Sequence, residues 1–249
     1  MEFYMWYWIL FILIIFLIIM QVVVANRFKK TLIHYSSVPN KSNITGAQVA
    51  RDILSKNGIS NVTVIRAGKE GIDHYDPRKN HIMLSPSIYD SSSIAAASVA
   101  AHEVGHAIQW GKKEFGIKFR DTLAPPVGII SNIGSVMMNI GFTLLIFGLI
   151  FGSNSTFGTF VFWILVPGIA VYGATALFQL VTLPVEYNAS YKARKQLQTM
   201  GFITTEEDKK ATKKVLNAAA LTYVMALLAT LAIFALFLLR LLAILGSRR

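Results

Sequence analysis

Four long apolar segments constrain the fold of this chain more than any other feature of its 249 residues. Each could form a helix that crosses the hydrocarbon core of a bilayer, which takes about 20 apolar residues. Hydrophobic residues make up 54% of the chain and charged residues only 15%, a composition too apolar for an ordinary soluble domain. The segments are residues 3–24, 126–151, 157–183 and 217–245. The sequence therefore predicts a mainly α-helical integral membrane protein with four transmembrane helices.

The basic residues predict how these helices are oriented. Residues 26–124 contain 14 Lys and Arg and residues 184–216 contain seven, whereas the connection 152–156 contains none. Four spans put both basic segments on one side, and cytoplasmic flanks of membrane helices carry an excess of Lys and Arg. We therefore expect a multi-pass protein of the plasma membrane with both basic segments in the cytoplasm. The net charge of +11 then reflects topology, and without an RNA-binding signature no nucleic-acid partner is expected.

This topology predicts five parts. Residues 1–26 form an N-terminal transmembrane anchor, and residues 27–125 form a cytoplasmic α+β domain. A transmembrane hairpin, a cytoplasmic helical segment, and a C-terminal transmembrane helix with its tail follow at residues 126–183, 184–216 and 217–249. Gly134, Gly141 and Gly148 recur every seven residues, which predicts a seam of close helix packing. Pro184 suits the first turn of a new helical section.

Capping signals locate helices in the α+β domain. Thr45-Gly-Ala-Gln48 matches a capping box, and Asn57-Gly58 is typical of a helix end. Asp90 or one of Ser91 to Ser93 is expected to begin the next helix.

Two strands are expected between those helices. Residues 62–66 and 81–85 are predicted to pair, and the turn residues between them include Asp76-Pro77. The second strand is either an ordinary hairpin edge or an edge on which an extended peptide substrate pairs.

The run His102-Glu103-Val104-Gly105-His106 lies in an alanine-rich stretch that is typical of a helix. Residues four apart share a helical face, so both imidazoles can reach one ion. The chain has no cysteine, so any metal must be held by His, Asp or Glu. A catalytic zinc site has three protein ligands and an open position for water, whose proton Glu103 can accept. The motif predicts one zinc ion per chain, bound by His102 and His106.

A third ligand has candidates on both sides of this motif. Downstream, Glu186 is one of few acids near a membrane boundary, where an unpaired carboxylate is costly. The predicted topology puts Glu186 on the same side as His102, and Ser190 faces the same way and can support a ligand. A capping or salt-bridging glutamate is the alternative interpretation. The upstream candidates are Asp73, His74, Asp76 and His81.

Three motifs together resemble a known family. His102-Glu-Val-Gly-His106 with Glu186-x-x-Ala-Ser190 resembles the membrane gluzincins, which include HtpX-type and CAAX prenyl proteases. With Asp73-His-Tyr-Asp-Pro-Arg78 and the one-plus-three arrangement of spans, the whole chain resembles the YugP family of bacterial membrane zinc metallopeptidases. The resemblance implies a zincin-like protease domain, zinc ligands His102, His106 and Glu186, and Glu103 as the general base. It departs from the gluzincin pattern at Ser190, which replaces an acid, so Asn188 or another residue takes the supporting contact.

The expected reaction is hydrolysis of peptide bonds in membrane or membrane-proximal proteins. The oxyanion needs a hydrogen-bond donor besides the metal, for which the candidates are His74, Tyr75, Tyr191 and Arg194. Two alternatives remain: an inactive zinc-binding scaffold or quality-control adaptor, and a metal-ion transporter. Glu103, which is not needed merely to hold zinc, disfavours the scaffold, and the absence of central charges in the second and third spans disfavours transport.

Overall fold

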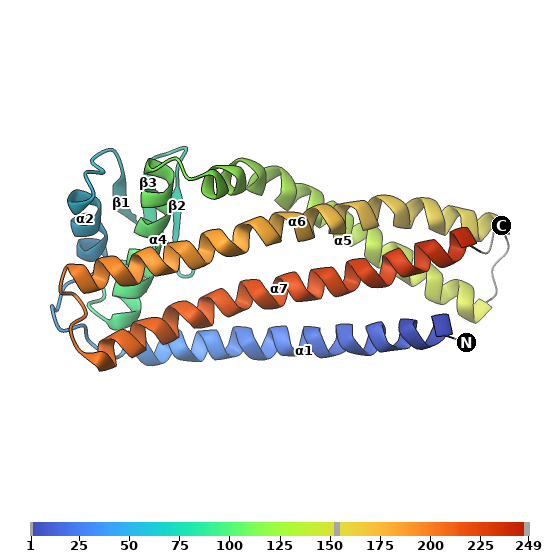
Figure 1. The fold of residues 1–249 in the computed structure, drawn as a ribbon, viewed down its shortest axis with the longest axis horizontal. Coiled ribbons are helices and arrows are strands. Elements are labelled where there is room, and N and C mark those ends of the chain that lie inside the picture. The colour runs from blue at the N-terminus through green and yellow to red at the C-terminus, as the bar shows by residue number, and fades with distance from the viewer. Residues whose placement is uncertain (1, 152–154, 247–249) are drawn as a thin grey trace. The chain divides into compact units, whose positions relative to one another are not determined.

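The computed structural model describes residues 2–151 and 155–246, which are mainly helical (Figure 1). They divide into two compact units, one of Met1–Gln21, Thr122–Leu180 and Val224–Arg249, the other of Val22–Asp121 and Val181–Tyr223. The helices are α1 (Glu2–Ser36), α2 (Gly46–Lys56), α3 (Pro86–Tyr89), α4 (Ile94–Gly111), α5 (Phe115–Phe151), α6 (Ser155–Thr199) and α7 (Glu206–Gly246). The strands are β1 (Thr63–Arg66), β2 (His74–Asp76) and β3 (His81–Leu84).

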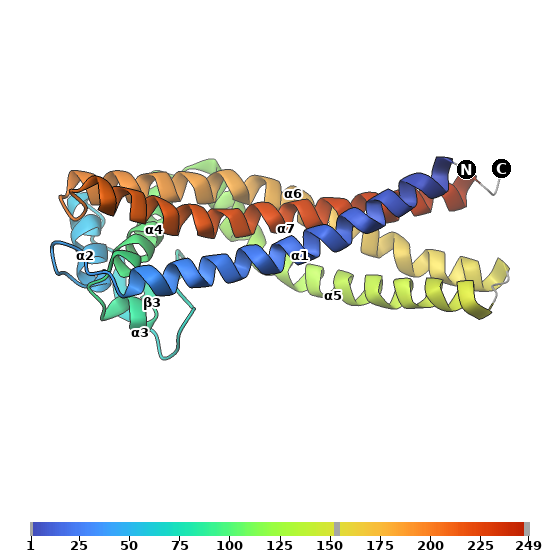
Figure 2. The ribbon, with the colours of Figure 1, turned by 90° about the horizontal axis from the view of Figure 1, so that it is seen from below.

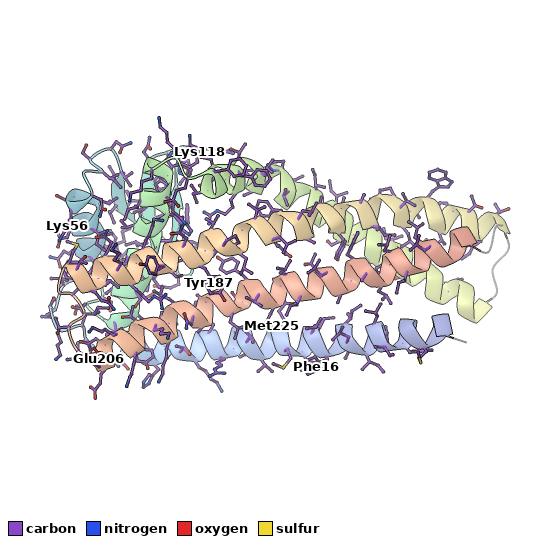
Figure 3. All side chains as sticks on the ribbon, in the orientation of Figure 1. Phe16, Lys56, Lys118, Tyr187, Glu206 and Met225 are labelled. Atoms are coloured by element: carbon purple, nitrogen blue, oxygen red, sulfur yellow. The ribbon has the colours of Figure 1, made fainter. Side chains whose placement is uncertain are left out.

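The four apolar segments lie in α1, α5, α6 and α7. Within the described residues, these four helices are long and apolar enough to cross a membrane. Their outer faces carry large apolar side chains: Ile12 and Phe16 of α1 are 64% and 56% exposed, and Phe16 points away from its helix in Figure 3. Such faces are costly in water and favourable in lipid, so they fit the prediction of membrane helices.

The long helices extend beyond the apolar segments, and one prediction about them was wrong. Pro184 does not begin a new helix but lies inside the continuous α6. A proline inside a helix removes one backbone hydrogen bond. The helix continues because the residues after Pro184 are anchored: Val185, Ala189 and Ala193 are buried, and the Val185 carbonyl accepts a hydrogen bond from Gln109.

Glycines let α5 and α6 pack closely, as predicted from their spacing. A Cβ atom on Gly134 would lie 2.4 Å from Cγ1 of Val171, and one on Gly141 would lie 2.5 Å from Cδ2 of Leu165. The hydroxyls of Ser131 and Thr175 also meet at 2.8 Å across the two helices. Gly148 lies outside the residues whose packing is described. The seam is therefore confirmed at two of its three positions.

Gly134→Leu should destabilise this helix pair by about 1–3 kcal/mol, the usual cost of forcing extra carbons into a packed interface. Gly128→Leu is the matched control, because nothing lies within 4 Å of a Cβ at Gly128 and the gain in helix propensity is the same. Unfolding of the purified proteins in detergent would measure the difference. Equal stability of the two variants would contradict close packing at Gly134.

A three-stranded sheet with the order β1-β3-β2 lies in the second unit. β1 pairs with β3, as predicted, but in parallel, so the two strands do not form a hairpin; β2 pairs with β3 antiparallel. The third strand was not predicted, because Asp76-Pro77 was assigned to a turn. Since β3 has a neighbour on both sides, the suggestion that a peptide substrate pairs with residues 81–85 was wrong.

Helix α4 runs through the core of this unit. Ser93 caps it by accepting a hydrogen bond from the Ala96 N–H, and the predicted capping box of α2 is formed by Thr45 and Gln48. Small side chains let neighbours approach α4 from several sides, so most of the helix is buried. The core combines side chains of α2, β3, α4 and α6, including Val49, Ile53, Ile82, Leu84, Ala100, Val104, Ala193 and Leu197.

Candidate metal centre

The two histidines of the motif lie on one face of α4, as the spacing predicts. Their ring centroids are 4.8 Å apart. His106 and Glu103 are buried, with 3% and 8% of their surface exposed, whereas the His102 side chain is 16% exposed. This helical face therefore presents two imidazoles and one carboxylate in a largely water-excluded setting.

Gly105 brings a second helix to this face. A Cβ atom at Gly105 would lie only 2.7 Å from the backbone carbonyl oxygen of Ala189 in α6. Because the glycine has no side chain, the two helices approach at backbone contact. This contact places Glu186 and Ser190, which flank Ala189 on α6, beside the two histidines.

Glu186 faces both imidazoles. Its Oε2 lies 3.2 Å from Nε2 of His102, and its Oε1 lies 3.5 Å from Nε2 of His106. The carboxylate is 5% exposed. Among the described residues, His102, His106 and Glu186 form one of two groups whose ligand atoms all lie within 4.8 Å of one another.

Two side chains fix the histidine rings from behind. The amide nitrogen of Gln109 donates a hydrogen bond to the Val185 carbonyl at 2.9 Å. The amide oxygen of Gln109 lies 3.0 Å from Nδ1 of His106 and therefore accepts a hydrogen bond from Nδ1–H of that ring. Nε2 of His106 then keeps its lone pair, directed toward Glu186. Ser190 Oγ lies 3.2 Å from Nδ1 of His102 and can accept a hydrogen bond in the same way. Contacts of this kind orient metal-binding histidines.

This donor set fits a zinc ion. With zinc–ligand bonds of about 2.0–2.1 Å, two ligand atoms of a tetrahedral site lie about 3.3–3.4 Å apart. The separations of 3.2 and 3.5 Å between the Glu186 oxygens and the two Nε2 atoms bracket this spacing. Two imidazoles and a carboxylate are also a ligand combination that catalytic zinc sites use.

The pKa of His102 links this site to pH. Burial lowers the pKa of the imidazole, but the hydrogen bond to Glu186 and the charges of Glu103 and Glu186 outweigh burial, so the pKa lies above its usual value. A metal ligand must be the neutral imidazole. Protons therefore compete with a metal ion at His102 increasingly as the pH falls through this raised pKa.

Sequence reasoning missed Arg120 on α5. Nη1 of Arg120 lies 2.5 Å from Oε1 of Glu186 and 3.4 Å from Nε2 of His106. Nε of the same guanidinium lies 2.8 Å from Oδ1 of Asp121. The guanidinium thus neutralises a buried carboxylate at the centre of the cluster. The place of Arg120 beside Asp121, shortly before Pro125 and Pro126, was the available signal, but Arg120 was counted only among the basic residues that orient the spans.

Gln109 and Tyr223 were also missed. Gln109 is 1% exposed and lies three residues after His106, on the same helical face, which was a usable signal for a contact with that ring. Tyr223 of α7 interacts electrostatically with Glu186, Glu103 and Arg120. Its position in an apolar segment far along the chain gave no such signal.

The upstream candidates for the third ligand lie elsewhere. His74, Asp76 and His81 form the second group of close ligand atoms, on β2 and β3. Asp73 accepts hydrogen bonds from the backbone and hydroxyl of Ser85, so its carboxylate is occupied. Asn188 is also directed away from the histidines, because it bonds to Glu114 and Lys192.

The remaining donor candidates differ in their surroundings. Tyr75 is buried, and burial together with the charges of Asp121 and Asp76 raises its pKa to about 12, so its phenol stays protonated at neutral pH. His74 is exposed, and its Nδ1 is 2.7 Å from the Ile72 carbonyl. Tyr191 is 58% exposed and lines a surface recess with Arg194.

Comparison with known proteins agrees with this geometry. Residues 9–245 match the model of a family described as "Putative neutral zinc metallopeptidase". The chain belongs to this family. It is also 38% identical over 208 residues, 84% of each chain, to the "Putative membrane protease YugP" of Bacillus subtilis (strain 168). No solved structure matches the chain. The resemblance to YugP-type zinc metallopeptidases is thereby confirmed.

Proposed function

We propose that this chain is a multi-pass zinc metalloendopeptidase that hydrolyses peptide bonds in membrane or membrane-proximal proteins. The observation that carries the proposal is the convergence of His102, His106 and Glu186, with Glu103 buried on the same helix. Family membership supports zinc and peptidase chemistry, and the four apolar helices support a membrane location.

His102, His106 and Glu186 would hold the ion, and Ser190 and Gln109 would keep the two rings in the tautomer that leaves Nε2 free. When bound, zinc supplies Lewis acidity, which lowers the pKa of a water and polarises the scissile carbonyl. Glu103 accepts the proton of the attacking water and passes it to the leaving amine.

Arg120 is a further candidate for stabilising the developing oxyanion. Its guanidinium reaches both Glu186 and His106, whereas Tyr191 and Arg194 lie at a separate surface recess. A fixed positive charge beside the reacting carbonyl stabilises negative charge in the transition state. Tyr75 remains a second candidate, since it is buried and protonated.

Metal content tests the ligand assignment. Purified protein should carry about one zinc ion, and His106→Ala should lose most of it, because two ligands do not retain a catalytic zinc tightly. His74→Ala is the matched control, since His74 belongs to the other His/Asp group. Elemental analysis measures zinc, and cleavage of an unfolded protein substrate should stop on chelation and resume when zinc is restored. Zinc loss in His74→Ala with none in His106→Ala would contradict the site.

Labelling of introduced cysteines tests the cytoplasmic orientation. The chain has no cysteine, so Ser55→Cys and Lys209→Cys each introduce a single thiol, one in each basic segment. Both should resist a membrane-impermeant thiol reagent in intact cells, whereas Ser153→Cys, which lies outside the described residues, should react. The reverse pattern would put the site on the outer face. Labelling at only one of the two basic segments would contradict the predicted topology of four spans.

The alternative is an inactive zinc-binding membrane scaffold or quality-control adaptor. It needs the same three ligands but not Glu103. A protein that binds one zinc ion and cleaves no protein substrate would favour it.

A further inference from the structure

A cavity of about 430 Å³ lies between α1 and the beginning of α7, away from the metal centre. Both segments that line it belong to the same compact unit, and Figures 1 and 2 both show them side by side. Its basic side chains are Arg27 from α1 and Lys210, Lys213 and Lys214 from α7. At about 30 Å³ per molecule of liquid water, the space is far larger than one ordered water fills.

Within the described residues, Arg27, Lys213 and Lys214 have no acidic partner in an ion pair, and Lys210 has only a longer-range interaction with Glu206. No acidic side chain lines the cavity, and within residues 2–151 and 155–246 none of the four forms an ion pair. Glu206, at the start of α7 in Figure 3, is paired with Lys209 at 2.7 Å. Four like charges around one cavity repel one another unless an anion occupies it. The charge pattern therefore favours an anionic ligand in this cavity.

The positive charge also continues beyond the cavity. A neighbouring recess shares Lys210 and Lys213 and adds Arg194 and Lys195 of α6, and its one acid, Glu206, is paired with Lys209. Clustered cations raise the local concentration of anions near the cavity mouth.

The cavity is polar at one end and apolar at the other. Val24 and Leu221 line it together with the cations. Val24 is the last residue of the first apolar segment, and Arg27 is the first charged residue after it. On α7, Lys214 is the last charge before a long apolar run. The lining thus changes from charged to apolar where both helices would leave the hydrocarbon core.

This change in polarity identifies the class of ligand. A free phosphate would use the cations but not the apolar wall, whereas a phospholipid uses both. Basic pockets between membrane helices are known to hold anionic lipid headgroups. The Thr31 hydroxyl donates to the Arg27 carbonyl in its own helix, so the cations and the amide of Asn217 are the donors that line the cavity for a phosphate.

We propose that this cavity binds the phosphate-bearing headgroup of an anionic phospholipid between α1 and α7. Arg27, Lys213 and Lys214 hold the phosphate, and the acyl chains run along the wall of Val24 and Leu221. The site does not depend on the metal centre or on peptidase activity.

Binding of phosphatidylglycerol to the full-length protein in nanodiscs or detergent, measured by native mass spectrometry, tests the proposal. Phosphatidylcholine is the neutral comparison lipid. The triple variant Arg27→Gln, Lys213→Gln, Lys214→Gln should bind phosphatidylglycerol about 10²-fold more weakly, because each basic residue near an anionic surface contributes roughly a factor of five. Lys56→Gln, Lys69→Gln, Lys79→Gln removes the same charge from the α+β region and should bind like wild type.

A second variant separates a cavity from general charge attraction. Ala218→Phe keeps all four cations and fills the space they line, so it should also lose phosphatidylglycerol. Unchanged binding in either the triple variant or Ala218→Phe would overturn the proposal, as would equal affinity for the two lipids. Displacement of the lipid by inorganic phosphate at equal concentration would identify a soluble phosphate as the ligand and overturn the lipid assignment.

Discussion

Glu103→Gln is expected to keep about one zinc ion per chain and to hydrolyse peptide bonds about 10²–10⁴-fold more slowly than wild type. Glutamine has nearly the same volume as glutamate, so the buried side chain still fits α4. It cannot accept the proton of the attacking water, and the reaction loses its general base. Zinc content and the rate of cleavage of an unfolded protein substrate, measured on the same preparation, check both halves of this result.

Glu114→Gln is the matched control for that experiment. It makes the same chemical change at a side chain that pairs with Lys192 at 2.9 Å and stays 31% exposed, where an ion pair contributes little. It should therefore keep full activity. Wild-type cleavage by Glu103→Gln would show that another group accepts the proton.

Gly105→Ala should damage the site although Gly105 binds nothing. The new Cβ would lie 2.7 Å from the Ala189 carbonyl oxygen, so α4 and α6 must separate. Glu186 would then move away from His102 and His106. We expect zinc affinity to fall about 10–100-fold and kcat/KM to fall about 10²-fold, because a displacement of about 1 Å is enough for such a loss. Zinc titration and steady-state kinetics measure the two effects.

Gly111→Ala separates this effect from a general response of α4 to alanine. Gly111 lies in the last turn of the same helix, and nothing lies within 4 Å of a Cβ built there. It should leave zinc affinity and activity unchanged. If both variants bind zinc like wild type, close approach of α4 and α6 is not what holds Glu186 in place.

Features set by local sequence could be predicted for this chain. The helix that carries His102 and His106 follows from its alanine-rich pattern and its cap at Ser93. Glu186 stood out because an acid beside an apolar segment needs a partner. The pairing of residues 63–66 with 81–84 follows from two short apolar runs in one domain, although its parallel direction was not predicted.

Features set by tertiary contacts could not be predicted. Arg120 reaches Glu186 only because α5 passes the α4–α6 contact, and no spacing in the sequence encodes that approach. The strand β2 was not predicted because Asp76-Pro77 is typical of a turn. Pairing with β3 stabilises β2, and this contact is not encoded in the local sequence. Pro184 favours a helix start locally, but the packing of the residues after it keeps α6 continuous.

The separation of 84 positions between His102 and Glu186 also bears on how the protein is made. A nascent chain that has emerged only through α4 carries the two histidines and Glu103 but lacks the carboxylate that completes the ligand set. The third ligand arrives only after α5 and most of α6 have been synthesised. Under the proposed function, the order of the segments along the chain therefore delays completion of the zinc site until most of the polypeptide has been synthesised.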